Sequence, residues 1–333
     1  MDPYALVILI PAYNDWVAVS LLLEQLDRSL AGKGLHSRVL LVDDGSTEPA
    51  GTAFDAVQLS SIDDTLILSL RRNFGHQRAI AIGLAFVESE LPCDAVVVMD
   101  GDGEDDPADV PRLIERCRAL GNTRVVFAER TRRVDSLTFR AFYACYRAAH
   151  WALTGVKVRV GNFSIIPRQV LRKLVTVSEL WNHYAAAVFV AKLPRDTVET
   201  TRRPRLHGRS KMNFGSLVGH GLSAMSVHGE ALAIRLLFGS LIVGFAVVAA
   251  LALMAGATGG YGTASTSVIV VGAVFALGLS AELVGMALML TLRTLQGRAA
   301  SGFLPLRDYK FFVDTVAPLR IRAGRAADTV RVS

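Results

Sequence analysis

Three carboxylates at alternate positions offer the clearest chemistry in this sequence. Asp100, Asp102 and Glu104 follow the apolar run at 96–99, within the segment VVVMDGDGEDDP. Along an extended chain alternate side chains point the same way, so we expect the three carboxylates on one side, where they repel unless a cation binds. Oxygen-only ligation suits Mg²⁺ or Mn²⁺, and Mg²⁺ usually shares its shell with substrate phosphates. The segment therefore predicts a divalent metal site for a phosphorylated ligand.

Spacing excludes several other kinds of site. An EF-hand loop needs Gly at its sixth position and Glu at its twelfth, where this segment has Asp105 and Pro111. The chain has no GxGxxG fingerprint after its first predicted strand and no P-loop pattern GxxxxGKS/T. Cys93, Cys117 and Cys145 have no CxxC spacing, so we interpret them as buried apolar residues rather than metal ligands or disulfides.

The elements that must position these residues alternate between strands and helices. Short apolar runs predict strands, and stretches with apolar residues at helical spacing predict helices between them. The predicted strands cover residues 5–10, 39–42, 66–70, 95–99 and 124–128, and the predicted helices cover 17–30, 76–89 and 108–120. Such alternation is typical of an α/β fold with a mostly parallel sheet.

Each predicted strand is followed by polar residues. In a parallel α/β sheet, ligands bind beyond the carboxyl ends of the strands, along one edge. In chain order, the strand ends carry the segments PAYND, DDGSTE, RRNFGHQR, DGDGEDDP and ERTRR. One polar loop after a strand is an ordinary solvated turn, but five in succession indicate a ligand site at that edge.

The last third of the chain predicts a membrane hairpin, which the overall composition of 51% hydrophobic residues does not reveal. No charged side chain occurs between Arg235 and Glu282, and residues 236–255 form an apolar run long enough to cross a bilayer. A second apolar run at 268–292 carries only Glu282. A carboxylate there is costly in lipid, so it indicates a buried partner, an oligomer contact or a polar cavity.

The hairpin divides the chain into four predicted parts. Residues 1–212 form a soluble domain, 213–235 an interfacial juxtamembrane helix, 236–292 the transmembrane hairpin and 293–333 a basic tail. The N-terminus has an acidic second residue and a short apolar run, unlike a signal peptide, so we expect the soluble domain in the cytoplasm. The tail has seven Arg and one Lys against three Asp, and the positive-inside rule puts it on the same side.

Taken together, the polar segments resemble the motifs of family 2 glycosyltransferases, which have the GT-A fold. The resemblance rests on PAYND, VDDGSTE, RNFG, the DxD of VVVMDGDGEDDP and RLHGRSK, and it covers about residues 4–235. More narrowly, the chain resembles polyprenyl-phosphate glycosyltransferases, which include dolichyl-phosphate mannose synthase-like enzymes and bacterial bactoprenol glucosyltransferases. Those enzymes transfer a sugar from a nucleotide sugar to a lipid phosphate with inversion. The resemblance implies a Rossmann-like GT-A domain followed by a two-helix membrane hairpin.

The resemblance implies a set of donor-binding residues by position. They are Pro11, Tyr13, Asp15, Asp44, Arg78 and Asp100. Asp15 stands where the family usually has Glu, and Asp44 is similar to the carboxylate that reads the base. Arg78 is similar to a basic residue contacting base or phosphate, a duty that His76 could share.

The resemblance also implies metal-binding and catalytic residues. Asp102 is similar to the residue that binds the metal between the two donor phosphates, with Asp100 beside it and Glu104 where Gln is common. Arg130, after the fifth predicted strand, is interpreted as an anion clamp. Arg130 is put before Arg132 and Arg133 because it lies closest to the strand end, and it makes up the predicted catalytic set with Asp102 and the position of Asn162.

The basic segment RLHGRSK matches an RxxGxS motif of the family's acceptor loop. It implies contacts to an acceptor phosphate from Arg205, Ser210 and Lys211, within a stretch at 200–214 that has five basic residues and no acid. The alternative is a juxtamembrane basic stretch attracted to anionic lipid headgroups, and both interpretations are compatible.

One departure from the family concerns the catalytic base. Where bactoprenol glucosyltransferases carry a DAGDF-type segment, this chain reads VGNFS, with Asn162 at the position of a carboxylate. A phosphate monoester acceptor, with a second pKa of about 6, is already ionised and needs little help. A hydroxyl acceptor needs a base, for which Glu179 or His183 is nearest in sequence, although His183 is also typical of a packed helix residue. Trp181 and Tyr184 either stack on a sugar or lie in the core.

These observations predict a membrane-anchored, inverting, metal-dependent glycosyltransferase of the cell inner membrane. We expect it to bind a UDP- or GDP-sugar, a polyprenyl phosphate or another lipid acceptor, Mg²⁺ or Mn²⁺ and the membrane, but no nucleic acid. The sequence does not decide whether the protein forms a homo-oligomer. One alternative is a family 2 transferase acting on another lipid or glycan. Another is a noncatalytic nucleotide-sugar-binding scaffold, motivated by Asn162 and Glu104. The sugar depends on pocket shape, which these motifs do not specify.

Overall fold

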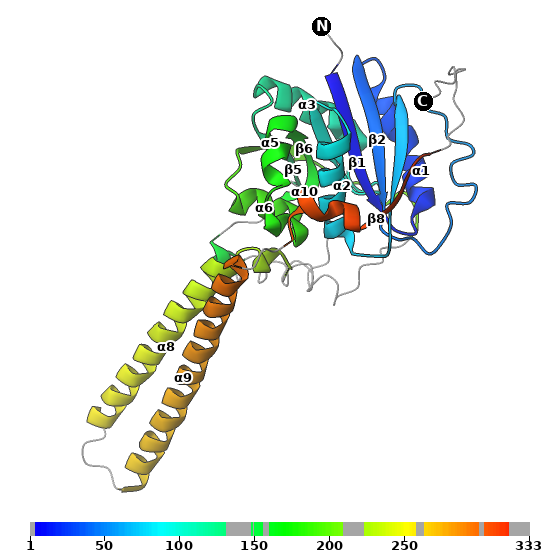
Figure 1. Ribbon diagram of the computed structural model, residues 1–333. Coiled ribbons are helices and arrows are strands. Elements are labelled where there is room, and N and C mark those ends of the chain that lie inside the picture. Colours follow the sequence, from blue (N-terminus) through cyan, green and yellow to red (C-terminus); the bar gives the residue numbers. More distant parts are fainter. Residues whose placement is uncertain are drawn as a thin grey trace. The chain divides into compact units, whose positions relative to one another are not determined.

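Two units make up the chain in the computed structural model (Figure 1), which describes residues 4–130, 148, 150–155, 160–208, 223–257, 263–299 and 303–319. The first unit holds the described residues from 4 to 130, from 160 to 227 and from 303 to 319. The second holds those from 148 to 155 and from 228 to 299. The chain thus leaves the first unit and returns to it after the hairpin.

A mixed β-sheet forms the centre of the first unit. Its strands are β1 (Tyr4–Ala12), β2 (Leu35–Asp43), β3 (Asp64–Leu70), β4 (Ala95–Val98), β5 (Val125–Arg130), β6 (Val160–Pro167), β7 (Arg195–Thr200) and β8 (Val313–Pro318). Their order across the sheet is β7-β5-β6-β4-β1-β2-β3-β8. β6 and β8 run antiparallel to their neighbours, and the other neighbouring pairs are parallel. This GT-A-like, mostly parallel arrangement confirms the predicted fold class.

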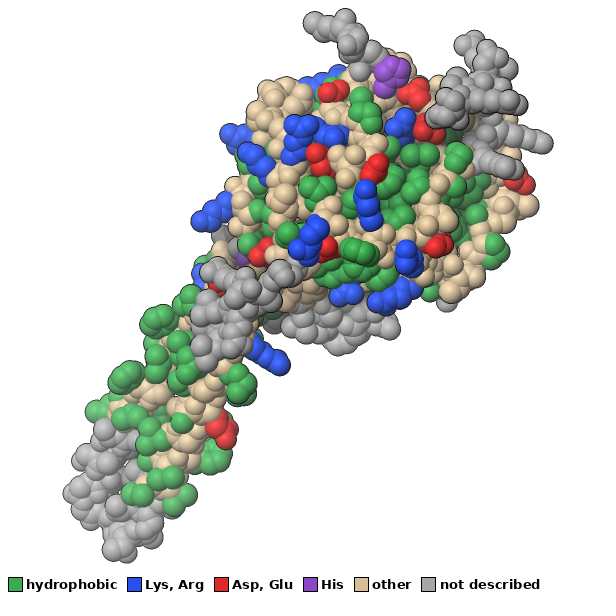
Figure 2. Space-filling view, in the orientation of Figure 1, with side chains coloured by type: hydrophobic (Ala, Val, Ile, Leu, Met, Phe, Trp, Pro, Cys, Tyr) green, Lys and Arg blue, Asp and Glu red, His purple; other side chains and the backbone are tan. Residues whose placement is uncertain are grey.

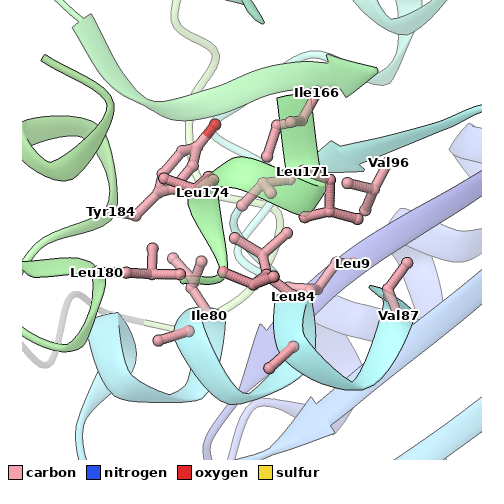
Figure 3. Packing of buried hydrophobic residues seen from close by; sticks show 14 of the residues in the cluster. Leu9, Ile80, Leu84, Val87, Val96, Ile166, Leu171, Leu174, Leu180 and Tyr184 are labelled. Carbon is pink, nitrogen blue, oxygen red and sulfur yellow. The ribbon is translucent and has the colours of Figure 1, made fainter. Parts of the chain in front are cut away.

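Helices cover both faces of the sheet. They are α1 (Trp16–Leu30), α2 (His76–Glu90), α3 (Val110–Ala119), α5 (Arg168–Leu174) and α6 (Tyr184–Val190), with short 3₁₀ turns η1 (Pro107–Asp109) and η2 (Ser178–Trp181). Side chains along β1 alternate between the faces. Val7 and Leu9 pack with α2, α5 and α6, a cluster that Figure 3 shows from close by. Leu6, Ile8 and Ile10 pack with α1 and α3. Burial on both faces explains the continuous apolar run of this strand.

The part of the predicted basic tail that the structure describes is integrated into the sheet. After the hairpin come α10 (Pro305–Asp308), the 3₁₀ turn η3 (Tyr309–Phe311) and β8, which pairs antiparallel with β3. Tyr309 is buried, and its hydroxyl donates to Glu90 Oε1 at 2.6 Å. The prediction of a separate tail over 293–333 is therefore corrected, because residues 303–319 complete one edge of the folded domain.

The second unit contains two long apolar helices that pack side by side, α8 (Gly229–Ala257) and α9 (Thr263–Ala299) (Figure 1). Segments Gly229–Ala250 and Val270–Leu290 are long and apolar enough to cross a membrane, and only 6% of each is buried. Burial this low distinguishes them from core helices of a soluble protein, and Figure 2 shows many hydrophobic side chains on the visible face of the two helices. Glu282 is exposed on α9.

The predicted boundary between an interfacial helix and the first span is also corrected. Residues 229–235 are the first turns of α8 rather than the end of a separate helix. Residues 213–222 of the predicted interfacial helix lie outside the described residues.

Candidate functional site

The ends of β1 and β2 are joined by hydrogen bonds at the carboxyl edge of the sheet. The Asn14 side-chain oxygen accepts from the Thr47 backbone N–H at 2.9 Å, and the Asn14 N–H donates to Ser46 Oγ at 2.9 Å. Asn14 has φ 50°, a left-handed conformation that Asn adopts more readily than most residues. This junction presents the predicted donor contacts Tyr13, whose side chain is exposed, and Asp15.

Asp44 binds the RNFG turn that begins α2. Its carboxylate oxygens accept from the backbone N–H groups of Phe74 at 2.7 Å and Gly75 at 2.9 Å. Burial raises the pKa of Asp44, although the two backbone hydrogen bonds favour the carboxylate. The adjacent Gly45, at φ 67°, lies so close to this turn that a Cβ would stand 2.4 Å from the carbonyl carbon of Arg72. The segments that follow three strands are thereby packed against one another.

The acidic turn after β4 does not present three carboxylates on one side of an extended chain. β4 ends at Val98, and the chain turns at 101–103, with Gly103 at φ 76°. The Glu104 N–H donates to Asp102 Oδ1 at 3.0 Å, which closes this turn. The prediction of an extended, alternating segment is therefore wrong, because a turn that needs glycine changes the direction of the chain between the carboxylates.

The basic segment at 202–208 lies along this acidic turn. Arg205 pairs with Asp102 Oδ2 at 3.2 Å through one nitrogen and with Asp15 through another, while Arg202 pairs with Glu104. Two backbone hydrogen bonds of 2.9 and 3.0 Å also join the segment to the turn. Arg205 thus links three sequence motifs that lie far apart along the chain, namely PAYND, the DxD and RLHGRSK.

Asn162 lies beside Asp100 because β6 runs antiparallel to β4. The register of the two strands, continued by two residues, puts these side chains opposite one another. The Asn162 amide nitrogen donates to Asp100 Oδ1 at 3.4 Å and lies 3.0 Å from His76 Nε2, while its oxygen accepts from Gln77 at 3.1 Å. The structure therefore brings Asn162 into the predicted site, with its amide engaged by neighbouring side chains.

His76 is the basic neighbour of the first carboxylate. Its Nε2 lies 3.1 Å from Asp100 Oδ1. Partial desolvation of the ring opposes protonation of the imidazole, but the carboxylates of Asp100 and Asp102 prevail and raise the pKa of His76. A protonated His76 neutralises Asp100 when no other cation is bound.

The carboxylates fit a metal site that is smaller than predicted. Within the described parts of the chain, no three His, Cys, Asp or Glu side chains are grouped to hold a metal ion. Mg²⁺ needs only one or two protein carboxylates where substrate phosphates complete its shell. Asp100 and Asp102 meet this requirement, since both lie at the strand-end edge beside polar partners. Glu104 is not grouped with them in the described structure, and its carboxylate pairs with Arg202, as that of Asp102 pairs with Arg205.

The remaining predicted residues have mixed placements. Pro11 lies inside β1, near its carboxyl end, and its carbonyl oxygen is close to Gly101 of the acidic turn. Arg130 is the last residue of β5, and its side chain is not described. Ser210 and Lys211 lie outside the described residues.

The residues considered for a base or for sugar stacking have different surroundings. His183 is buried at the N-cap of α6, where Nδ1 accepts from the Ala186 N–H at 3.4 Å, and Tyr184 is buried in the core (Figure 3). Trp181 is partly buried among other aromatic rings. Sequence reasoning missed Gln77, which supports both Asn162 and the Tyr184 backbone. Only its position, directly after the RNFGH segment at a strand end, indicates from the sequence that Gln77 lies near the site.

The region that contains these site residues is similar in sequence to known proteins. The sequence profile of glycosyl transferase family 2 matches residues 7–175. An undecaprenyl-phosphate 4-deoxy-4-formamido-L-arabinose transferase of Erwinia tasmaniensis is 28% identical over 63% of this chain and 64% of that protein. A bactoprenol glucosyl transferase of Shigella phage SfX is 26% identical over 62% of this chain and 66% of that protein. The matched regions span just under two thirds of the length of these two relatives.

Solved structures give a more distant match. The UDP complex of glucosyl-3-phosphoglycerate synthase from Mycobacterium tuberculosis has a TM-score of 0.47 and 16% identity, over 68% of this chain and 80% of that chain. Mannosyl-3-phosphoglycerate synthase from Rubrobacter xylanophilus has a TM-score of 0.44 and 14% identity, over 70% of this chain and 74% of that chain.

Proposed function

The chain belongs to glycosyl transferase family 2, and from that premise we propose that it transfers a sugar from a nucleotide sugar to a polyprenyl phosphate, with inversion. Two relatives, an undecaprenyl-phosphate 4-deoxy-4-formamido-L-arabinose transferase and a bactoprenol glucosyl transferase, support this acceptor. The donor is a UDP- or GDP-sugar. The single observation that carries the proposal is the link that Arg205 makes between Asp15 and Asp102.

This link joins groups suited to the two phosphorylated substrates. Asp15 follows β1 at the proposed donor site, and Asp102 belongs to the DxD turn. Arg205 presents a planar guanidinium, which matches phosphate oxygens better than an ammonium group does. We propose that it turns from the carboxylates to the acceptor phosphate, with Ser210 and Lys211 following it on the same segment.

Asp100 and Asp102 are the residues that would hold Mg²⁺ or Mn²⁺. A bound divalent cation would neutralise negative charge on the departing nucleoside diphosphate. Arg78, at the start of α2, adds a positive charge for the donor, and Arg130 adds a second at the end of β5.

The proposed acceptor explains why Asn162 can replace a carboxylate. A lipid phosphate attacks the anomeric carbon through an oxygen that is already ionised near neutral pH, and the bond to the donor phosphate breaks. No proton has to be removed from the nucleophile. Asn162, hydrogen-bonded to Asp100 and Gln77, then orients the metal-binding carboxylate rather than acting as a base.

We further propose that α8 and α9 cross the inner membrane as a hairpin, with the sheet domain and the segment after α9 in the cytoplasm. The exposed apolar surfaces of both helices and the basic residues after the second support this topology. A lipid phosphate at the headgroup level is then available to a domain tethered to the same leaflet.

The test is nucleoside diphosphate release by the detergent-purified full chain. Several UDP- and GDP-sugars are supplied with Mn²⁺ or Mg²⁺, with and without undecaprenyl phosphate. We expect release that requires the lipid phosphate and disappears in Asp102→Ala. Glu115→Ala, at an exposed position of α3, is the matched control and should retain release. Release without lipid, or equal release from Asp102→Ala, would contradict the proposal.

A further inference from the structure

The segment after the membrane hairpin reaches the loop that begins α2. The Arg71 N–H donates to the Phe312 carbonyl at 3.0 Å, and its Nε donates to the Val313 carbonyl at 3.1 Å. These bonds join the end of β3 to the start of β8. The RNFG turn, whose other side is held by Asp44, is therefore fixed to residues that follow α9 in the sequence.

An aromatic cluster lies at this junction. Trp181 stands 3.8 Å from Phe303 and 4.9 Å from Phe312, measured between ring centroids. Phe312 also meets Phe74 edge to face at 5.0 Å. Aromatic pairs at the separations of Phe312 from Trp181 and Phe74 attract beyond simple burial of area. The cluster thus joins the RNFG turn, η2 and the segment at 303–319.

Arg78 rests on this cluster. Its guanidinium carbon lies 5.0 Å from the centre of the Trp181 ring, within the range of a cation–π contact. Arg78 is on the exposed side of the first turn of α2, where a long side chain otherwise samples many rotamers. The Trp181 ring restricts those rotamers, and Phe303 and Phe312 in turn restrict the ring.

We infer that Trp181 and Phe312 are positioning residues, which hold Arg78 in the orientation that binds the nucleotide of the donor. This inference rests on the proposed function, because it takes Arg78 as a donor-binding residue. It assigns the segment at 303–319 a role in the donor site, although that segment lies beyond the region matched by the family profile.

Phe311 provides a matched control for Phe312. It is the preceding residue, it is 73% exposed, and it takes no part in the aromatic contacts that join Trp181 to Phe74. Phe312→Leu keeps an apolar side chain at the position while removing the ring. A comparison of Phe312→Leu with Phe311→Leu therefore separates the ring contact from the general effect of losing a phenylalanine in this segment.

The experiment measures binding of UDP and GDP with Mn²⁺ to the full-length protein in detergent by calorimetry, together with donor KM and kcat. We expect Phe312→Leu and Trp181→Leu to weaken binding of the preferred nucleotide by up to about fivefold, because a cation–π contact of about 1 kcal/mol can favour one orientation of Arg78 by that factor. Donor KM should rise with kcat nearly unchanged. Trp181→Phe should restore part of the affinity, and Phe311→Leu should bind like the wild type.

A double substitution tests whether Phe312 acts through Arg78. In an Arg78→Gln background, Phe312→Leu should weaken nucleotide binding no further. An equal additional loss in that background would overturn the inference, as would identical binding by Phe312→Leu and the wild type. In both of those outcomes the proposed transferase function survives. A wild-type protein that binds neither nucleotide would overturn the proposed function and the inference together.

Discussion

Gly45→Ala is expected to disrupt the junction between three strand ends. Gly45 has φ 67°, a conformation that costs an alanine about 1–2 kcal/mol. The new Cβ would also lie 2.4 Å from the Arg72 carbonyl carbon and 2.6 Å from the Asn73 nitrogen. Both contacts are to backbone, so the RNFG turn must move, and overpacking of this kind costs a further 1–3 kcal/mol or so. The free energy of unfolding should therefore fall by about 2–5 kcal/mol.

Gly51→Ala separates the two contributions. Gly51 has φ 54°, and nothing lies within 4 Å of its expected Cβ, so only the conformational cost of about 1–2 kcal/mol applies. Urea denaturation of both full-length variants in the same detergent gives the comparison. We expect Gly45→Ala to be the less stable variant by about 1–3 kcal/mol and to bind nucleotide more weakly. Equal stabilities and unchanged nucleotide binding would refute the close packing of Gly45 under the turn.

Three further predictions concern separate parts of the first unit. Asp27→Asn should lower the free energy of unfolding by about 1–3 kcal/mol, measured by urea denaturation, because its buried carboxylate accepts three consecutive backbone N–H groups at 60–62; an unchanged value would contradict this. Burial raises the pKa of the Cys117 thiol to about 11. In a variant that lacks Cys93 and Cys145, the rate of Cys117 alkylation should therefore become high only as the pH rises toward 11, because the thiolate is the reactive form. Rapid labelling at pH 8 would contradict this prediction. Arg205→Gln should strengthen Mn²⁺ binding about fivefold, because an ion pair worth about 1 kcal/mol no longer competes with the metal for Asp102. Electron paramagnetic resonance titrations measure this affinity. Weaker Mn²⁺ binding by the variant would contradict the competition.

Apolar patterning predicted the parallel part of the fold because most residues of those strands are buried or partly buried. The predicted strands and helices match β1 to β5 and α1 to α3 within a few residues. β7 and β8 were missed because they lie at the two edges of the sheet and are largely exposed, so they lack an apolar run. The sequence indicated β6 only as the motif around Asn162. Its antiparallel direction is set by pairing with β4 and β5, and no local pattern indicates it.

The candidate site was predictable in its residue types but not in its pairings. The strand-end rule brought the acidic turn and the RNFG turn to one edge. Asp102 and Arg205 are 103 residues apart, and the sequence offers no signal that they form an ion pair. The same holds for Trp181, whose partners Phe74 and Phe312 lie far from it in the sequence, one before it and one after it. Such contacts depend on tertiary packing rather than on local pattern.

The most direct test of the central claim is the identity of the product. The full-length protein is incubated with undecaprenyl phosphate, Mn²⁺ and the donor that supports nucleotide release, and the lipid fraction is analysed by mass spectrometry. We predict a lipid phosphate heavier by one sugar residue, formed by the wild type and absent with Asp102→Asn. Free sugar without a glycosylated lipid, or the same lipid product from Asp102→Asn, would contradict the account.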